Sequence, residues 1–284
     1  MTMTPPVSPE RQNAVIAAVQ MVSGPRVADN LATAGRLVTE AVAQGARIVA
    51  LPEYFPIMGM AEGDKVKVRE IDAGIGLGAA AGPIQTFLAE TAKKHRIWLI
   101  GGSIPLAGQD PKKVLNSTVV YDPEGQRVAR YDKIHLFGFQ KGGERYDEAA
   151  SIEPGRDPIA FDTPYGRIGL SICYDLRFPE LYRALGPVDL IVVPAAFTET
   201  TGRAHWEILL RARAIENQCY VLAVGQGGRH ENGRETHGNS MIIDPWGTIL
   251  DRKLKGPGVV AAQLDHGYLA EVRANLPALK HRVL

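Results

Sequence analysis

Short runs of apolar residues alternate with amphipathic segments along the whole chain. The continuous apolar run 14–21 predicts a buried strand, and the apolar positions of 27–44 recur at helical spacing until Gly45, which predicts a helix. The same alternation continues to the last third of the sequence. It predicts further strands at 47–51, 97–101, 167–173, 189–194 and 219–224, and further helices at 83–95, 179–185 and 204–217.

Two antiparallel hairpins are predicted around short turn sequences. Asp122-Pro-Glu-Gly125 separates the runs 114–121 and 127–135, and Pro245-Trp-Gly247 separates 241–244 and 248–252. Segment 48–55 weakly resembles segment 190–197, a similarity that two buried strands could also share by chance. Two βαβ-plus-hairpin halves would bury two sheets face to face with helices outside. We therefore predict an α/β fold, a four-layer α-β-β-α sandwich.

Composition and charge exclude several classes of protein. The chain has 284 residues, 45% of them hydrophobic, with a net charge of +1, so it lacks the basic field that nucleic acid or an acidic membrane surface attracts. The apolar stretch 190–197 is far shorter than the roughly 20 residues of a membrane span. Residues 1–12 are polar and read as a loose tail without a signal peptide, and no linker divides 13–284, so we expect one domain.

The cysteine and histidine patterns favour neither metal nor cofactor. Cys173 and Cys219 are too few for a disulfide framework or a cysteine-rich zinc site, which points to a reducing, cytoplasmic compartment. His205-Trp-Glu207 lacks the Pro-Cys-x-x-Cys partner of a zinc deaminase, and the sequence contains no phosphate-binding loop and no His-Glu-x-x-His. We expect a protein that works without metal or cofactor.

Three reactive side chains stand where apolar runs end or are interrupted. Glu53 directly follows a strand and precedes the aromatic Tyr54 and Phe55. A carboxyl group with apolar walls has a raised pKa and suits a general base. The alternative is a carboxylate at a strand end that turns to solvent. Lys133 interrupts the run 127–135, where the alternative is an ordinary solvated sheet face.

Cys173 closes the predicted strand 167–173 and begins a polar turn. Backbone N–H groups at such a junction favour a thiolate and later an oxyanion. The alternative is a small buried hydrophobe, which is our interpretation of Cys219. Each of the three signals is weak when it is taken singly.

Together and in this order, Glu53, Lys133 and Cys173 resemble the Glu–Lys–Cys triad of the nitrilase superfamily of carbon–nitrogen hydrolases. They are separated by 80 and 40 residues, as this family would place them. The segments 173–180, 204–220 and 244–247 resemble the amidase branch that includes deaminated glutathione amidase and ω-amidase. True nitrilases usually carry Cys-Trp-Glu where this chain has Cys-Tyr-Asp, which argues against nitrile hydrolysis.

The resemblance implies further site residues. A second glutamate is expected between the lysine and the cysteine, either Glu148 or Glu144. Arg177 is a candidate for the carboxylate end of a substrate, with a structural ion pair to Asp175 or Glu180 as the alternative. The remaining residues expected to line the substrate pocket are Tyr54, Tyr174, Phe197, Thr198 and Thr201.

The resemblance also implies the reaction. The expected substrate is a small amide that carries a carboxylate, deaminated glutathione first and α-keto acid ω-amides next, hydrolysed to an acid and ammonia or an amine through a thioester. The alternatives are an N-carbamoyl amino acid hydrolase, a nitrilase, or a non-catalytic binding module. C-terminal segments exchange across a dimer interface in this family, and the apolar segment 276–284 therefore predicts a homodimer, open to further assembly.

Overall fold

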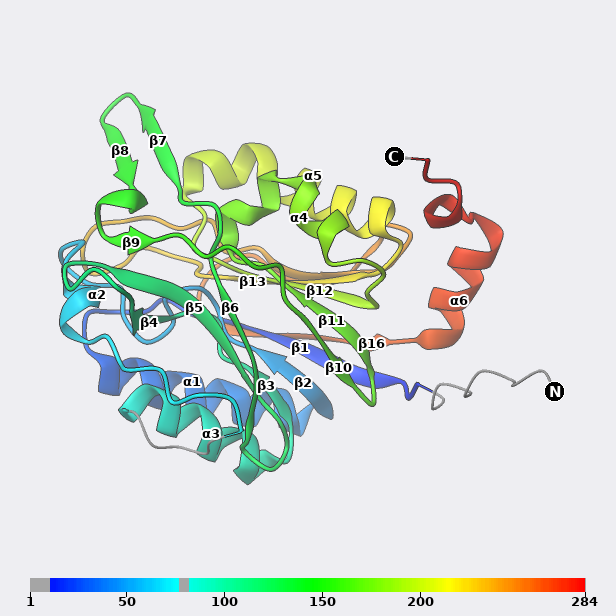
Figure 1. Cartoon of the computed structure of the whole chain (residues 1–284), viewed down its shortest axis with the longest axis horizontal. Coiled ribbons are helices and arrows are strands. Elements are labelled where there is room, and N and C mark those ends of the chain that lie inside the picture. The colour runs from blue at the N-terminus through cyan, green and yellow to red at the C-terminus, as the bar shows by residue number, and fades with distance from the viewer. Residues whose placement is uncertain (1–10, 77–81, 284) are drawn as a thin grey trace.

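Two β-sheets lie face to face in the centre of the protein, and helices cover their outer faces (Figure 1). The computed structural model describes residues 11–76 and 82–283. The first sheet has the strand order β16 (Gly258–Leu264), β1 (Ala14–Gln20), β2 (Ala46–Ala50), β3 (Trp98–Ile100), β5 (Val114–Tyr121) and β4 (Ile104–Ala107), with β6 (Arg127–Asp132) and β9 (Ile152–Glu153) also paired to β5.

The second sheet repeats the arrangement with the later half of the chain. Its strand order is β10 (Ala160–Thr163), β11 (Gly166–Leu170), β12 (Leu190–Ala195), β13 (Tyr220–Gly225), β14 (Ser240–Ile243) and β15 (Ile249–Lys253). A small separate hairpin, β7 (Gly138–Lys141) with β8 (Glu144–Asp147), projects from the body (Figure 1).

Helices complete the four layers. Figure 1 shows α1 (Val27–Ala43) and α3 (Pro83–His95) on the outer face of the first sheet, and α4 (Pro179–Ala184) and α5 (Glu199–Asn217) on the outer face of the second. The short α2 (Asp64–Lys67) lies near β4, and α6 (His266–Asn275) extends away from the sandwich. The predicted α-β-β-α sandwich is thus confirmed.

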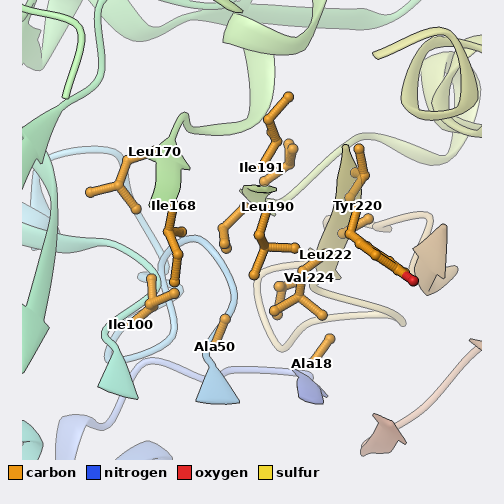
Figure 2. Packing of buried hydrophobic residues seen from close by; sticks show 14 of the residues in the cluster. Ala18, Ala50, Ile100, Ile168, Leu170, Leu190, Ile191, Tyr220, Leu222 and Val224 are labelled. Carbon is orange, nitrogen blue, oxygen red and sulfur yellow. The ribbon is translucent and has the colours of Figure 1, made fainter. Parts of the chain in front are cut away.

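Alternation along the strands explains the layers. In β1, Ile16 and Ala18 face the second sheet, whereas Ala17 and Val19 face α1 and α3. In Figure 2 the side chains of the second sheet's central strands extend toward small residues such as Ala18 of the first sheet. Both faces of these strands are buried, which is why the sequence shows continuous apolar runs there.

Several boundaries differ from the predictions. Helix α5 begins at Glu199 instead of residue 204, because the Thr198 side chain accepts a hydrogen bond from the N–H of Thr201 and caps it earlier. Strand β6 ends at Asp132, so Lys133 follows the strand and does not belong to it. Of the predicted tail 1–12, residues 1–10 lie outside the described part, while Gln12 donates a hydrogen bond to the carbonyl of Pro164.

Gly102, which follows β3, packs closely against the backbone of the segment that follows β2. A Cβ at this position would lie 2.1 Å from the carbonyl oxygen of Pro52 and 2.7 Å from that of Leu51, and its φ is +54°. The neighbouring Ser103 hydroxyl accepts a hydrogen bond from the N–H of Tyr54 at 3.0 Å. This close approach of two backbones holds the segment that carries Glu53.

We expect Gly102→Ala to destabilise the protein by about 3 kcal/mol or more, since left-handed strain and a clash with rigid backbone add together. Gly142→Ala is the matched control, because Gly142 has φ +60° and a Cβ added there would meet nothing within 4 Å. It should cost about 1–2 kcal/mol from strain alone. Urea unfolding of both variants measures the difference, and equal losses would contradict the steric explanation.

Candidate active site

Lys133 lies at the centre of a buried ionic cluster. Its side chain is fully buried, and its Nζ lies 2.9 Å from Oε1 of Glu53 and 2.7 Å from Oε2 of Glu148. Its backbone is fixed on both sides, since its N–H donates to the carbonyl of Asn116 and its carbonyl accepts from the N–H of Gly155. Burial of this depth rules out the alternative of a solvated sheet face.

The two carboxylates keep the Lys133 ammonium charged. Burial alone would lower the pKa of Lys133, but the negative charges of Glu148 and Glu53 outweigh it and raise the pKa above its usual value. A permanently charged ammonium can stabilise negative charge that develops beside it.

Glu53 is held by groups from both sheets. It follows β2 and is completely buried, so the alternative of a carboxylate turned to solvent is wrong. Its Oε1 accepts a hydrogen bond from Asn116 Nδ2 at 3.0 Å, and its Oε2 accepts one from the N–H of Ala196 at 2.8 Å. Ala196 directly follows β12, so the ends of the central strands of the two sheets meet at this carboxylate.

Glu148 forms the second ion pair with Lys133, in addition to the pair with Glu53. It begins a 3₁₀ turn (Glu148–Ala150) and accepts hydrogen bonds from the Tyr54 hydroxyl at 2.8 Å and from the N–H of Phe137 at 2.7 Å. Burial opposes ionisation, but Lys133 and these donors lower the pKa of the carboxyl group below its usual value. Glu148 is thus the glutamate that the structure brings to Lys133. The side chain of Glu144, the other candidate, lies outside the described part.

Cys173 stands beside this cluster on a tight turn. Strand β11 ends at Leu170, and Cys173 begins a 3₁₀ turn (Cys173–Arg177) with φ +51°, a conformation that is unusual for a residue other than glycine. Burial and then the charge of Glu53 raise the pKa of the thiol well above its usual value, although Lys133 opposes this effect. The thiol therefore rests protonated, in hydrogen-bonding contact with Glu53.

Asp175 links the turn at Cys173 to the segment around Lys133, a role that the sequence did not predict. This fully buried carboxylate accepts hydrogen bonds from the Tyr131 hydroxyl at 2.6 Å, from the N–H of Ile172 at 2.8 Å and from the N–H of His135 at 3.0 Å. Tyr131 and His135 lie on either side of Lys133, so one carboxylate sets the distance between the two chemical groups.

Cys173 opens into a small cavity. Five of the predicted substrate-pocket residues line it: Tyr174, Arg177, Phe197, Thr198 and Thr201. Tyr54, the sixth predicted pocket residue, donates a hydrogen bond to Glu148 and does not line this cavity. It lines two adjoining cavities.

Arg177 and Arg234 are the basic residues of the cavity wall. Arg177 donates a hydrogen bond to Nδ1 of His205 at 3.2 Å and lies over the rings of Tyr174 and Phe197. Among the described side chains it forms no ion pair with Asp175 or Glu180. Arg234 was missed because it stands in a polar loop without any motif around it, so only the fold shows that it reaches the cavity.

The described residues show no grouping of three or more His, Cys, Asp or Glu side chains that could hold a metal ion. Over the same residues, every helix is too short or too polar to cross a lipid bilayer. What the cluster offers chemically is a thiol that lines the cavity, with a carboxylate and a fixed ammonium buried beside it. Such a set suits nucleophilic attack on a carbonyl carbon.

Comparison with known proteins agrees with this geometry. Deaminated glutathione amidase of Synechocystis sp. is 42% identical over 274 residues, which cover 94% of this chain and 97% of that protein. Omega-amidase NIT2 of Danio rerio is 38% identical and covers 94% of each chain. The crystal structure of Saccharomyces cerevisiae Nit3, a member of branch 10 of the nitrilase superfamily, superposes with a TM-score of 0.85 at 28% identity, covering 96% of this chain and 97% of that one.

The model of the carbon-nitrogen hydrolase family matches residues 15–274, nearly all of the sandwich. The predicted resemblance to the nitrilase superfamily is therefore confirmed, and the chain belongs to the carbon–nitrogen hydrolase family.

Proposed function

We propose that the protein is a cysteine-dependent amidase that hydrolyses a small carboxylate-bearing amide, with deaminated glutathione as first candidate and α-keto acid ω-amides as second. The observation that carries the proposal is the position of Cys173, which lies beside the ion pair of Glu53 with Lys133 and lines a cavity whose wall carries arginine. The names of the relatives, deaminated glutathione amidase and omega-amidase, support the choice of substrate.

Acylation begins with proton transfer inside the cluster. Glu53 takes the proton of the Cys173 thiol, and the thiolate attacks the amide carbonyl carbon to form a tetrahedral intermediate. The oxyanion accepts hydrogen bonds from Lys133 Nζ and the backbone N–H of Tyr174, and each donor of this type is worth about 10²–10³ in rate. Glu53 then returns its proton to the leaving nitrogen, and the C–N bond breaks to leave a thioester.

Deacylation uses the same base. Glu53 takes a proton from water, the hydroxide oxygen attacks the thioester carbonyl, and the C–S bond breaks to release the acid. The proton on Glu53 returns to the Cys173 sulfur, which restores the starting state. Glu148 acts in both halves by holding the Lys133 ammonium in place and charged.

Two other reactions use the same chemistry. An N-carbamoyl amino acid hydrolase would release carbon dioxide together with ammonia, so its products distinguish it from an amidase. A nitrilase would release the same products as an amidase and is distinguished by its substrate, a nitrile. A non-catalytic binding module is disfavoured, because a protein without activity would have no reason to bury Lys133 and Glu53 beside a protonated thiol.

The direct test is hydrolysis of deaminated glutathione, followed through α-ketoglutarate and cysteinylglycine, beside α-ketoglutaramate, followed through ammonia. We expect Cys173→Ala to abolish both reactions. The matched control is Cys219→Ala, since Cys219 is also buried but lies away from the cluster, where burial raises its thiol pKa to about 12.

If the protein hydrolyses neither substrate but Cys173 is still alkylated by iodoacetamide, the amidase mechanism stands and these two substrates are excluded. A Cys173→Ala variant that still hydrolyses either substrate would refute the catalytic assignment itself. Equal loss in both cysteine variants would show a packing effect instead of catalysis.

The role of Glu53 can be tested through pH. The Glu53 charge is one cause of the raised thiol pKa, so Glu53→Gln should move the alkylation midpoint of Cys173 to lower pH. The same variant should hydrolyse amides at least about 10²-fold more slowly, since the base is gone. A more easily ionised thiol would thus accompany slower turnover, whereas a midpoint that moves upward would contradict the assignment. Iodoacetamide alkylation, followed from neutral pH to the highest pH at which the protein stays folded, provides the measurement.

We also propose a homodimer. Ile208 of α5 is 70% exposed, Trp246 of the β14–β15 turn 58%, and Ile215 of α5 reaches Gly247 of that turn, so the three side chains form one apolar face. Exposed apolar side chains continue at the C-terminal end, where Leu276 is 48% exposed. A face of this kind on the outer helix layer fits contact with a second copy of the chain.

We expect Ile208→Glu to convert the dimer into a monomer in sedimentation velocity, because it places a charge in the centre of the face. Met60→Glu is the control, since Met60 is 60% exposed near α2, away from α5. A wild-type protein that sediments as a monomer at micromolar concentration would refute the dimer.

The compartment we propose is the cytoplasm. Cys173 and Cys219 are both free thiols, and the mechanism requires Cys173 to stay reduced. Recovery of the native protein from a secreted fraction would contradict this assignment.

A further inference from the structure

Arg234 occupies the point where three cavities meet. It lines the cavity that contains Cys173 and two neighbouring cavities, both of which are also lined by Tyr54. It stands in the loop between β13 and β14, far in sequence from the other site residues.

Most of the hydrogen-bonding capacity of Arg234 is unused by the protein. Its Nη2 donates to the carbonyl of Ala196 at 2.7 Å, and its Nε is buried without a hydrogen-bond partner. Among the described side chains no carboxylate lies within ion-pair distance of its guanidinium, which instead lies 5.3 Å from the centroid of the Tyr146 ring. A partly buried guanidinium with spare donors and no carboxylate within ion-pair distance suits the binding of an anion.

The Ala196 peptide places Arg234 beside the reaction centre. The N–H of Ala196 donates to Glu53, and its carbonyl accepts from Arg234, so a single residue joins the base and the guanidinium. Arg177 lies further out, because its partner His205 is on the exposed side of α5. The cavity therefore has an inner and an outer cation.

We infer that Arg234 binds the carboxylate of the acyl half of the substrate, the half that becomes the thioester on Cys173. This assignment rests on the proposed amidase function and makes it more specific. The outer Arg177 then faces the leaving group. Deaminated glutathione carries one carboxylate at each end, which matches two cations at different depths.

The charges of the site explain why such a cation is needed. Ionised Glu53 and Glu148 with protonated Lys133 sum to one negative charge. A substrate carboxylate would be repelled by this excess in a cavity that is poorly screened by water. Arg234 cancels the excess charge and lets an anionic acyl chain enter. A rival explanation is that Arg234 only balances the glutamates and never touches the substrate.

A matched pair of amides separates the two explanations. α-Ketoglutaramate and 4-oxopentanamide have the same chain, but the second carries a methyl group where the first carries the carboxylate. We expect Arg234→Met to lower the ratio of kcat/KM for the charged over the neutral amide about 10- to 100-fold, the usual worth of a hydrogen bond to a charged group. Arg234→Lys should restore part of the ratio, because it keeps the charge without the guanidinium fork.

Arg36→Met is the matched control, since Arg36 lies on the outer helix α1 with its side chain 64% exposed, and it should leave the ratio unchanged. If Arg234→Met slows both amides by the same factor, Arg234 does not act on the carboxylate, and if Arg234→Lys restores the ratio in full, Arg234 only balances charge. Either result shows that the inference is wrong. An unchanged ratio in a folded Arg234→Met variant overturns it as well.

A second measurement does not depend on turnover. α-Ketoglutarate should protect Cys173 of the wild-type protein from iodoacetamide, and Arg234→Met should raise the concentration needed by a similar factor of about 10- to 100-fold. If the protein hydrolyses neither amide but shows this protection and its loss, the carboxylate site stands and the proposed substrates fall. If it hydrolyses both amides and the protection is insensitive to Arg234, only the present inference falls.

Discussion

The ammonium of Lys133 lies between two carboxylates in the interior, and the rest of the site is arranged around it. A buried lysine without partners would lose its proton, because the interior penalises an isolated charge by several kcal/mol. Here Glu53 and Glu148 reverse that penalty, so Lys133 keeps its charge. Removing one partner of a buried pair typically costs about 3–5 kcal/mol. The segments that carry these three residues must therefore meet in one geometry whenever the protein is folded.

The same cluster controls the nucleophile. The negative charge that keeps Lys133 protonated also keeps the Cys173 thiol protonated, and burial acts in the same direction. A thiol at rest reacts slowly with oxidants and electrophiles, since the thiolate is the reactive form. In the proposed mechanism, chemistry starts only when the proton moves to Glu53 while a carbonyl group lies next to the sulfur. The tight turn at Cys173 and the carboxylate of Asp175 hold the sulfur in that place.

The sequence reveals the parts of this protein that obey short-range rules. Continuous apolar runs predicted the central strands, and the ends of those runs marked Glu53 and Cys173 as separate candidates. Only the resemblance to the nitrilase superfamily joined them into one site. The short strands β4, β9 and β10 were not predicted, because two to four residues are too few to show a hydrophobic periodicity. The roles of Arg234 and Asp175 in the site were not predicted for a different reason. Their importance comes from contacts across many residues of sequence, with Ala196 and with Tyr131, that no local spacing encodes.

The weak similarity between segments 48–55 and 190–197 gains a physical meaning from the structure. Segment 48–55 spans the end of β2 and the turn beyond it, and segment 190–197 spans β12 and the two residues after it. Both strands are central in the two facing sheets, and their ends meet at the site. Glu53 at the end of one segment aligns with Ala195 of the other, which contributes no charge there. The next residue, Ala196, offers its N–H to Glu53 and its carbonyl to Arg234. Two similar halves thus build an unsymmetrical centre: one end supplies the base, and the other supplies the peptide that orients the base and the inner cation. A second carboxylate in place of Ala195 would crowd like charges at this junction and raise the pKa of one of them. Because Ala195 carries no charge, the proposed mechanism can use Glu53 as the single base in both halves of the reaction.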